Sequence, residues 1–505
     1  MYRMCLFIAT IPVGQTWARF LPGRPAGPRG GCAVAARWPT RLTSMEQPAQ
    51  RGGPPAGRWR APAATAPVRA RVSIPGSKSM TNRALVLAAL ADGPGTITGP
   101  LRARDTLLMR AALTALGATI TDTLPNDADP AGPAPSWQVA PGRPGAGASV
   151  DVGNAGTVLR FAPPVAALTG ASVAFHGDAR ATERPVGPIL AGLRELGAVI
   201  DDGGRGALPF TVHGRGSVPG GAVTVDASAS SQFVSGLLLA APRFDKGAEI
   251  RHRGGRGPSA PHIAMTVAML RDAGAEVETW TRDSGTPAGV ADTWRVHPGA
   301  IGHHDVIVQP DLSNAVPFLA AAVVTGGAVT IADWPVVTSQ PAGQILDLLT
   351  AFGADCTPGS RDGEAGRGLT VTGTGRIRPV TADLADFSES ATVAAVLAAL
   401  ADGPSRLTGI GHMRRHETDR LAALAAEIGA LGGDVSELPD GLEIRPRPLR
   451  ASGRPFASYD DHRMVMAAAV LGLAVPGIEV ENAATVAKTF PGFTRLWASM
   501  LEQVP

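Results

Sequence analysis

The chain has 505 residues, which is too long for one hydrophobic core and predicts two or three domains. With 44% hydrophobic and 18% charged residues the composition is that of a globular protein, and no run of about 18 apolar residues predicts a membrane span. The first 71 residues hold eleven Arg against one Glu, so the other 434 carry a net charge of −7, which argues against a nucleic-acid groove.

The cysteine and lysine contents indicate the compartment and the chemistry. Three cysteines (5, 32 and 356) form neither a disulfide framework nor a C-x-x-C zinc motif, which favours a reducing compartment. Of the 46 basic residues only three are lysines, at positions 78, 246 and 488. Lysine differs from arginine where a compact charge or a transferable proton is required, so these positions are candidates for chemistry.

The segment 1–67 is rich in Gly, Pro, Ala and Arg and has no helical or strand periodicity. We expect it to be a disordered leader. A start at Met45 would remove most of it, and the true start and the role of the leader stay open. A second Pro/Gly/Asp-rich stretch, 124–147, is predicted to be a surface insertion around a short strand near 137–140.

The rest of the chain repeats a unit in which an apolar helix is followed by a glycine turn and a strand. Glycines that mark this turn recur every 74–79 residues, at positions 93, 170, 247, 326, 403 and 477. A second marker, a helix that ends in Leu-Gly-Ala or a similar sequence, recurs every 77–80 residues. The sequence therefore predicts six units of roughly 75 residues, each with two helices and several strands.

A polar cluster precedes each marker glycine by about the length of one helix. The six clusters comprise residues 77–79, 154–157, 230–232, 311–313, 388–390 and 460–463. Ser, Asp and Asn are ordinary helix N-caps, but Lys78, Arg83, Arg160 and Arg463 oppose the helix dipole at these positions. Bound anions would compensate them, because helix N-termini attract phosphate and carboxylate groups. We therefore expect a cleft that binds small phosphorylated substrates.

Seven motifs together resemble 5-enolpyruvylshikimate-3-phosphate (EPSP) synthases, occur in the order found in that family, and span residues 75–491. They are Pro-Gly-Ser-Lys-Ser-Met-Thr-Asn-Arg (75–83), Gly-Asn-Ala-Gly-Thr (153–157), Glu-Arg-Pro (183–185), Ser-Ser-Gln-Phe (230–233), His-Glu-Thr-Asp-Arg (416–420), Asp-His-Arg-Met (461–464) and Lys-Thr-Phe-Pro (488–491).

The resemblance implies an α/β fold of two inverse α/β domains, each built from three βαβαββ units, with the active site between them. The first domain would be discontinuous and comprise residues 68–76 plus 310–505. The second would comprise residues 77–309.

The implied reaction moves the enolpyruvyl group of phosphoenolpyruvate to the 5-hydroxyl of shikimate 3-phosphate, on the route to chorismate and the aromatic amino acids. It releases phosphate through addition and elimination, and it uses neither a metal nor an organic cofactor. We expect a cytoplasmic monomer that binds no nucleic acid and no membrane. Because Gly156 and Thr157 keep the unsubstituted motif, we also expect glyphosate to compete with phosphoenolpyruvate.

The family's functional residues map onto this chain position by position. Shikimate 3-phosphate would be bound by Lys78, Ser79, Arg83, Ser230, Ser231, Gln232, Ser259, Glu389 and His416. Phosphoenolpyruvate would be bound by Lys78, Gly156, Arg184, Gln232, Arg420, Arg463 and Lys488. Glu389 would take the proton of the attacking hydroxyl, and either Lys78 or Glu417 would protonate the methylene carbon.

Several residues depart from the family pattern, and two alternatives stay open. Glu389 and His416 stand where many members have Asp and Lys, and the imidazole would make the contact of His416 pH-sensitive near neutrality. His412 and His262 replace an Asn and a Tyr. The alternatives are a UDP-N-acetylglucosamine enolpyruvyl transferase, whose characteristic Cys is absent from the loop 180–185, and a catalytically inactive anion-binding relative.

Overall fold

The computed structural model describes residues 57–123, 135–142, 147–253, 259–281, 291–303, 305–361 and 364–503. Residues 1–56 of the expected leader and most of the expected insertion at 124–147 lie outside these ranges. The predicted strand near 137–140 is present as β5 (Ser136–Ala140).

The strands are β1 (Trp59–Arg60), β2 (Arg69–Val72), β3 (Gly95–Thr98), β4 (Thr119–Thr123), β6 (Ser149–Asp151), β7 (Ser172–His176), β8 (Val199–Asp201), β9 (Phe210–His213), β10 (Gly221–Val225), β11 (Ala248–His252), β12 (Val277–Trp280), β13 (Thr293–Val296), β14 (Val306–Ile307), β15 (Ala328–Ile331), β16 (Asp355–Arg361), β17 (Glu364–Thr372), β18 (Thr381–Asp383), β19 (Ser405–Thr408), β20 (Asp434–Leu438), β21 (Gly441–Arg445) and β22 (Glu479–Val480). The helices are α1 (Lys78–Ala89), α2 (Arg104–Ala115), α3 (Gly156–Ala167), α4 (Ala179–Glu183), α5 (Gly187–Glu195), α6 (Gln232–Ala240), α7 (Ala260–Asp272), α8 (Leu312–Thr325), α9 (Ala342–Ala351), α10 (Ala391–Ala399), α11 (Arg420–Ala430), α12 (His462–Ala474) and α13 (Phe493–Glu502), with 3-10 turns η1 (Ala241–Arg243), η2 (Ser388–Ser390), η3 (Gly411–Arg415) and η4 (Ala483–Lys488).

The predicted repeat appears in the structure as a four-stranded sheet whose strand arrangement recurs along the chain. Within the described ranges, five four-stranded sheets have the orders β14-β3-β5-β4, β6-β7-β9-β8, β10-β11-β13-β12, β2-β15-β17-β16 and β18-β19-β21-β20. In every one of them the first two strands are parallel and the remaining neighbours are antiparallel. A parallel pair needs a crossover, which a helix provides, and the sheets that start with β6, β10 and β18 each come from one continuous βαβαββ stretch. In the other two sheets the first strand, β14 or β2, comes from a distant part of the sequence. The expected α/β class is thereby confirmed.

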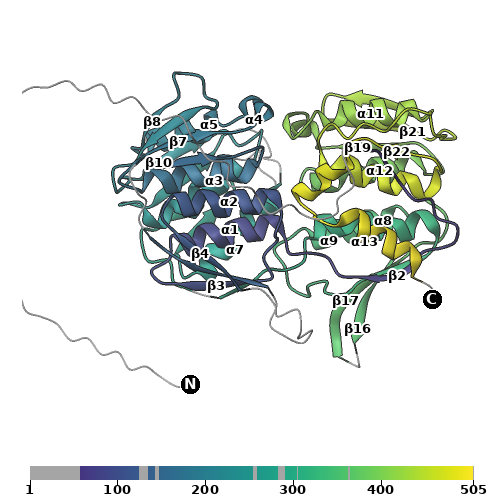
Figure 1. Cartoon of the computed structure of the whole chain (residues 1–505), viewed down its shortest axis with the longest axis horizontal. Helices are drawn as coiled ribbons and strands as arrows, with labels where there is room; N and C mark the ends of the chain where they lie inside the picture. Colours follow the sequence, from purple (N-terminus) through teal and green to yellow (C-terminus); the bar gives the residue numbers. More distant parts are fainter. Residues whose placement is uncertain are drawn as a thin grey trace, which may run out of the picture. The chain divides into compact units, whose positions relative to one another are not determined.

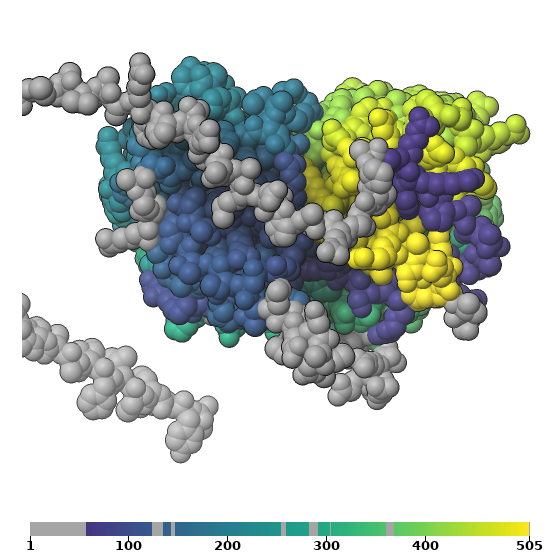
Figure 2. Space-filling view, in the orientation of Figure 1, coloured from purple at the N-terminus to yellow at the C-terminus, as the bar shows by residue number. Residues whose placement is uncertain are grey.

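The sixth sheet corrects the expected leader. Strand β1 pairs with β22 in an antiparallel ladder, and Ala61, which is 2% exposed, donates its N–H to the carbonyl of Ile478. Figure 2 shows the purple atoms of this N-terminal segment against the yellow C-terminal ones. The folded part of the chain thus begins before residue 68, because residues 59–60 pair with β22 and Ala61 is buried.

Apolar side chains form two separate cores. One collects buried residues from the range 80–308, and the other collects them from 61–74 and 312–500. Figure 1 shows α1, α2 and α3 grouped in the first part and α8, α12 and α13 in the second. Helices α1, α2 and α3 contact one another, α8 contacts α12, and Phe318 of α8 packs against Trp497 of α13. The domain bounds at 76 and 310 stay a prediction.

The chain passes between the two cores twice, and the two crossings lie side by side. Ser77 donates its N–H to the carbonyl of Gln309 at 2.7 Å, and Asp311 donates to the carbonyl of Pro75 at 2.9 Å. Gly76 lies between them, and a Cβ there would stand 2.3 Å from the carbonyl oxygen of Gly99. Only glycine permits this close backbone approach. Residues 55–505 consequently form one compact unit.

Candidate active site

All six predicted polar clusters lie at helix starts. The helices α1, α3, α6, α8 and α12 begin at Lys78, Gly156, Gln232, Leu312 and His462, and η2 leads directly into α10. The side chains of Ser77, Asp311 and Asp461 accept backbone N–H groups at the starts of α1, α8 and α12. These caps begin each helix at a fixed residue, so the polar residue that follows has a defined position.

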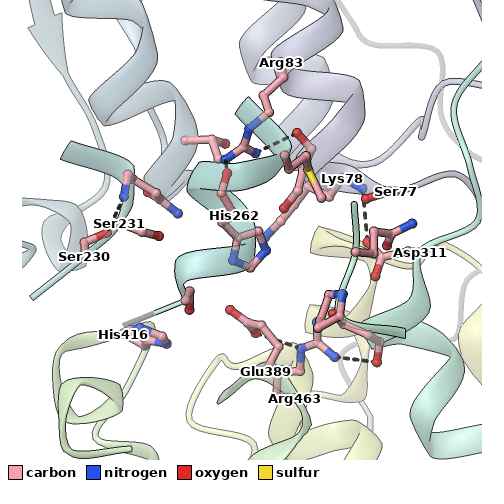
Figure 3. Close-up of a pocket in the computed structure, with 18 of the residues that line it drawn as sticks. Ser77, Lys78, Arg83, Ser230, Ser231, His262, Asp311, Glu389, His416 and Arg463 are labelled. Atoms are coloured by element: carbon pink, nitrogen blue, oxygen red, sulfur yellow. Dashed lines mark hydrogen bonds and ion pairs between the residues drawn. The ribbon is translucent and has the colours of Figure 1, made fainter. Parts of the chain in front are cut away.

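One pocket collects most of these helix starts, and Figure 3 shows it. Its lining includes every residue that we expected to bind shikimate 3-phosphate. They are Lys78, Ser79, Arg83, Ser230, Ser231, Gln232, Ser259, Glu389 and His416. Lys78 and His262 face Glu389 and Arg463 across the pocket, with the Ser230–Ser231 pair on a third side (Figure 3). Helix dipoles and cations therefore point at one space, which suits an anionic ligand.

Glu389 is the carboxylate at the centre of this pocket. Its Oε2 lies 3.4 Å from a terminal nitrogen of Arg420 and 3.3 Å from Nε of Arg463, and its side chain is 31% exposed. Burial alone raises the pKa of this carboxyl, but the positive charges of Arg420 and Arg463 outweigh it and hold the pKa well below its usual range. Without substrate Glu389 is therefore ionised and able to accept a proton.

His416 contradicts the expectation of a pH-sensitive contact near neutrality. A terminal nitrogen of Arg420 lies 3.1 Å from Nδ1 of His416. A guanidinium only donates, so Nδ1 must accept and the ring proton resides on Nε2. Burial, together with the charge of Arg420, lowers the pKa of His416 to about 3. The ring is consequently a neutral N–H donor at physiological pH.

The two other histidines of the pocket are also neutral. Nε2 of His412 pairs with the Ser388 hydroxyl at 3.0 Å, and the rings of His412 and His416 meet edge to face with centroids 5.4 Å apart. Burial and the nearby Arg83 lower the pKa of His262 to about 4, and burial lowers that of His412. The three histidines that depart from the family pattern are thus uncharged, and all three line the pocket of Glu389.

A second carboxylate, Glu417, collects the cations expected to bind phosphoenolpyruvate. It lies 3.0 Å from Nζ of Lys488, 3.1 Å from Arg420 and 3.9 Å from Arg184, all buried. Burial raises the pKa of Glu417, but these three cations lower it well below the usual range. Glu417 and Lys488 face a neighbouring pocket rather than the one lined by Glu389.

Gly156 lies directly against two of the arginines. A Cβ at this position would stand 2.7 Å from Arg184 and 2.8 Å from Arg160. Arg160 is held in place by the carbonyl of Pro185, at 2.5 Å. The absent side chain leaves room at the N-terminus of α3 for a ligand to reach both the helix start and the guanidinium groups.

Three residues near the site were missed by sequence reasoning. Asp105 lies 3.4 Å from Nζ of Lys78, and Gln340 and Met265 line the pocket of Glu389. Each belongs to the interior of an element or to a loop without a motif, so no local pattern distinguishes it. Within the described ranges, no group of three or more His, Cys, Asp or Glu side chains is arranged to hold a metal ion. None of the helices described is both long and apolar enough to cross a membrane.

Known proteins match both the sequence and the fold. The sequence profile of the EPSP synthase (3-phosphoshikimate 1-carboxyvinyltransferase) family matches residues 62–497. A 3-phosphoshikimate 1-carboxyvinyltransferase of Kocuria rhizophila is 52% identical over 440 residues, which cover 86% of this chain and 94% of that protein.

Two solved structures share the fold at lower identity. EPSP synthase from Acinetobacter baumannii superposes with a TM-score of 0.68 at 24% identity, covering 87% of this chain and 97% of that one. The enolpyruvyl transferase NikO from Streptomyces tendae gives a TM-score of 0.65 at 18% identity, with 87% and 96% covered. The fold agrees with the sequence profile and with the close relative, and the chain belongs to the EPSP synthase family.

Proposed function

We propose that this protein transfers the enolpyruvyl (carboxyvinyl) group of phosphoenolpyruvate to the 5-hydroxyl of shikimate 3-phosphate, giving 5-enolpyruvylshikimate 3-phosphate and phosphate. One observation carries the proposal for the site. All nine side chains assigned to shikimate 3-phosphate line a single pocket, and four cations assigned to phosphoenolpyruvate lie beside Glu389 of that pocket or beside Glu417 of the neighbouring one.

Shikimate 3-phosphate occupies the pocket of Glu389 in this proposal. The hydroxyls of Ser230, Ser231 and Ser259 bind its phosphate near the start of α6, where the helix dipole adds to their effect. His416 donates Nε2–H to a ring hydroxyl, because its Nδ1 is already occupied by Arg420. Lys78, Ser79, Arg83 and Gln232 complete the binding site.

Phosphoenolpyruvate lies between this pocket and Glu417. Arg184, Arg420, Arg463 and Lys488 neutralise its phosphate and carboxylate, and Gly156 leaves room for it at the start of α3. Arginine forks suit both groups because they donate two parallel hydrogen bonds to a pair of oxygens. Fixed protein cations thus supply the charge compensation that a metal ion supplies in many phosphoryl sites.

The reaction proceeds by addition and then elimination. A proton is added to the methylene carbon of phosphoenolpyruvate while the 5-oxygen of shikimate 3-phosphate bonds to the adjacent carbon and gives its proton to Glu389. The bond from that carbon to the phosphate oxygen then breaks with its electron pair. The group that gave the first proton then takes one back from the new methyl group, which restores the double bond, and the proton on Glu389 leaves with the phosphate.

We assign the proton of the first step to Lys78. In the protein without substrate Glu417 is ionised by its three cationic neighbours and has no proton to give. Lys78 extends into the pocket from the first residue of α1, and its ammonium group carries transferable protons. Lys78→Arg should therefore reduce turnover by roughly 100-fold or more, as loss of a general acid does. Near-normal turnover in Lys78→Arg would return the assignment to Glu417.

Product analysis by mass spectrometry tests the reaction and separates it from that of the rival family. Incubation with phosphoenolpyruvate and shikimate 3-phosphate should convert the latter to its enolpyruvyl ether. Replacing shikimate 3-phosphate by UDP-N-acetylglucosamine should give no ether. The reverse pattern would assign the protein to the UDP-sugar enolpyruvyl transferases, and no product in either reaction would make it an inactive relative.

The cellular setting completes the proposal. The cysteine content fits the cytoplasm, and the two cores of one chain supply a complete site, so we propose a cytoplasmic monomer. Glyphosate should compete with phosphoenolpyruvate, since Gly156 and Thr157 are unsubstituted. Insensitivity of the purified protein to micromolar glyphosate would contradict this.

A further inference from the structure

The side chain of Gln340 makes contacts that none of the seven motifs explains. It is 7% exposed and lies in the loop before α9, next to the second crossing between the cores. Its Nε2 donates to the carbonyl of Pro310 at 2.8 Å, and its Oε1 accepts the N–H of Leu312 at 3.0 Å. The amide therefore holds the residues on both sides of Asp311.

Asp311 lies between the two residues that Gln340 binds, and its carboxylate contacts the starts of two helices. Its Oδ1 accepts the N–H of Asn314 in α8, and its Oδ2 accepts the N–H of Lys78 in α1, both at 3.1 Å. Figure 3 shows Asp311 beside Ser77 and Lys78 at the edge of the pocket. One carboxylate thus satisfies N–H groups of two helices that belong to different cores. A small shift of Asp311 would move Lys78 relative to Glu389 and Arg463.

The loop that carries Gln340 is itself fixed to the crossing. The Thr338 hydroxyl donates to Oε1 of Gln309 at 2.6 Å and accepts the backbone N–H of Gln340 at 3.0 Å. Nε2 of Gln309 donates to the carbonyl of Val337 at 2.8 Å. These bonds form a continuous chain from Gln309 through the loop to Pro310 and Leu312, on either side of Asp311. The amide of Gln340 is therefore held in one orientation, with its donor and acceptor both used.

We propose that Gln340 is a positioning residue for the reaction. Gln340 keeps the Asp311 carboxylate where it accepts hydrogen bonds from Lys78, at the start of α1, and from Asn314, at the start of α8. The expected effect on turnover rests on the proposed function, whereas the hydrogen bonds themselves are independent of it. Gln340 acts through Asp311 and touches neither reacting group in the mechanism above.

The decisive variant is Gln340→Met, which keeps the length of the side chain, removes both hydrogen bonds and adds no charge to an anion-binding pocket. Hydrogen exchange of the Lys78 backbone amide should become about tenfold faster, since a buried hydrogen bond contributes about 1.4 kcal/mol. The kcat/KM values for both substrates should also fall by about tenfold, mostly through kcat. The matched control is Gln344→Met, two residues into α9, which should leave both quantities unchanged.

A double-mutant cycle distinguishes positioning from general stabilisation. Asp311→Asn keeps an N-cap acceptor for α8 but loses one of the two carboxylate oxygens. If Gln340 acts through Asp311, adding Gln340→Met to Asp311→Asn should reduce kcat/KM little further. Fully additive losses, or a lowered melting temperature with unchanged kcat/KM of the folded protein, would show that Gln340 only stabilises α8.

A second variant and a measurement that needs no turnover complete the test of Gln340. Should Gln340→Met fail to fold, Gln340→Glu keeps the acceptor for Leu312, replaces the donor to Pro310 by a carboxylate oxygen and adds one negative charge; it should show faster exchange at Lys78 as well. The exchange measurement needs no turnover. A wild-type protein that forms no product would refute the proposed function, whereas unchanged exchange of the Lys78 amide in the variant would refute the role of Gln340.

Discussion

At the residue scale, the protonation of His416 is decided by one neighbour. Arg420 donates to its Nδ1 at 3.1 Å and also contacts Glu389 and Glu417. The pKa of Arg420 is raised, because the nearby carboxylates outweigh the cost of burial, so this donor is permanent. A lysine at position 416 would carry a charge into the same place. His416 instead offers a neutral N–H beside an ionised Glu389.

The pH dependence of catalysis should accordingly contain no contribution from His416. Its pKa of about 3 leaves the ring neutral at every pH above 5. Profiles of kcat/KM for the wild type and for His416→Gln should therefore have the same shape between pH 5.5 and 8, although the variant is slower. Substrate phosphates titrate near pH 6, and the comparison cancels them. An inflection near pH 6.5 present in the wild type and missing from the variant would contradict the assignment.

The same residue marks a limit of sequence reasoning. The motif 416–420 predicted that His416 lies at the site, and the residue lines the pocket of Glu389, but the expected sensitivity near neutrality used only the ordinary pKa of a histidine. The actual value depends on burial and on the direction in which Arg420 points. Neither follows from a local pattern, because both arise when segments distant in sequence pack together.

At the element scale, the helix starts were predictable and the strand pairings were not. A polar cluster followed by an apolar helix occurs six times in the sequence, at a nearly constant spacing. The pairing of β1 with β22 joins residues more than 400 positions apart, as the contact of Arg58 with Glu479 illustrates, and β1 contains only two residues. Such a strand has no periodicity to detect, so its segment was expected to be disordered.

Truncation should reveal the contribution of this N-terminal segment. Removing residues 1–56 should leave the melting temperature unchanged. Removing residues 1–66 should lower it by about 2 °C or more, because Ala61 packs against Gly472 and the N–H groups of Ala61 and Ala64 donate to Ile478 and Leu473. Differential scanning calorimetry of both truncated proteins checks this. Equal melting temperatures would mean that β1 contributes nothing to stability.

A methyl group at the start of α3 should act on phosphoenolpyruvate selectively. In Gly156→Ala the new Cβ would stand 2.7 Å from Arg184 and 2.8 Å from Arg160, so the guanidinium groups must move. We expect KM for phosphoenolpyruvate to rise by roughly tenfold, as a misplaced charged hydrogen bond requires, with KM for shikimate 3-phosphate nearly constant. Steady-state kinetics with each substrate varied in turn measures both. Equal increases in the two KM values would place Gly156 outside the phosphoenolpyruvate site.

At the scale of the whole molecule, the buried neutral histidines of the site make the free energy of unfolding depend on pH. Burial lowers the pKa of four histidines in or beside the site, namely His262, His412, His416 and His462. Unfolded histidines take up protons below about pH 6.5, whereas these stay neutral in the folded protein. The unfolded state then binds more protons, so the free energy of unfolding must fall as the pH falls.

The melting temperature should therefore decrease between pH 7.5 and pH 5.5. Each of these histidines contributes at most about 1.4 kcal/mol over this range, in which the ionised Glu389 and Glu417 do not titrate. Replacing His262 by Phe should reduce the slope, because one histidine that stays neutral in the folded protein is removed. Calorimetry at constant ionic strength measures it, and a melting temperature that stays constant across the range would show that the histidines are protonated in the folded state.

The transfer reaction is tested most directly by phosphate release from the purified wild-type protein. Phosphoenolpyruvate and shikimate 3-phosphate are supplied together and each alone, with EDTA present throughout. We predict release only when both are present, with one phosphate for each molecule of enolpyruvyl ether formed. No release by a folded protein given both substrates, or equal release from phosphoenolpyruvate alone, would contradict the proposed function.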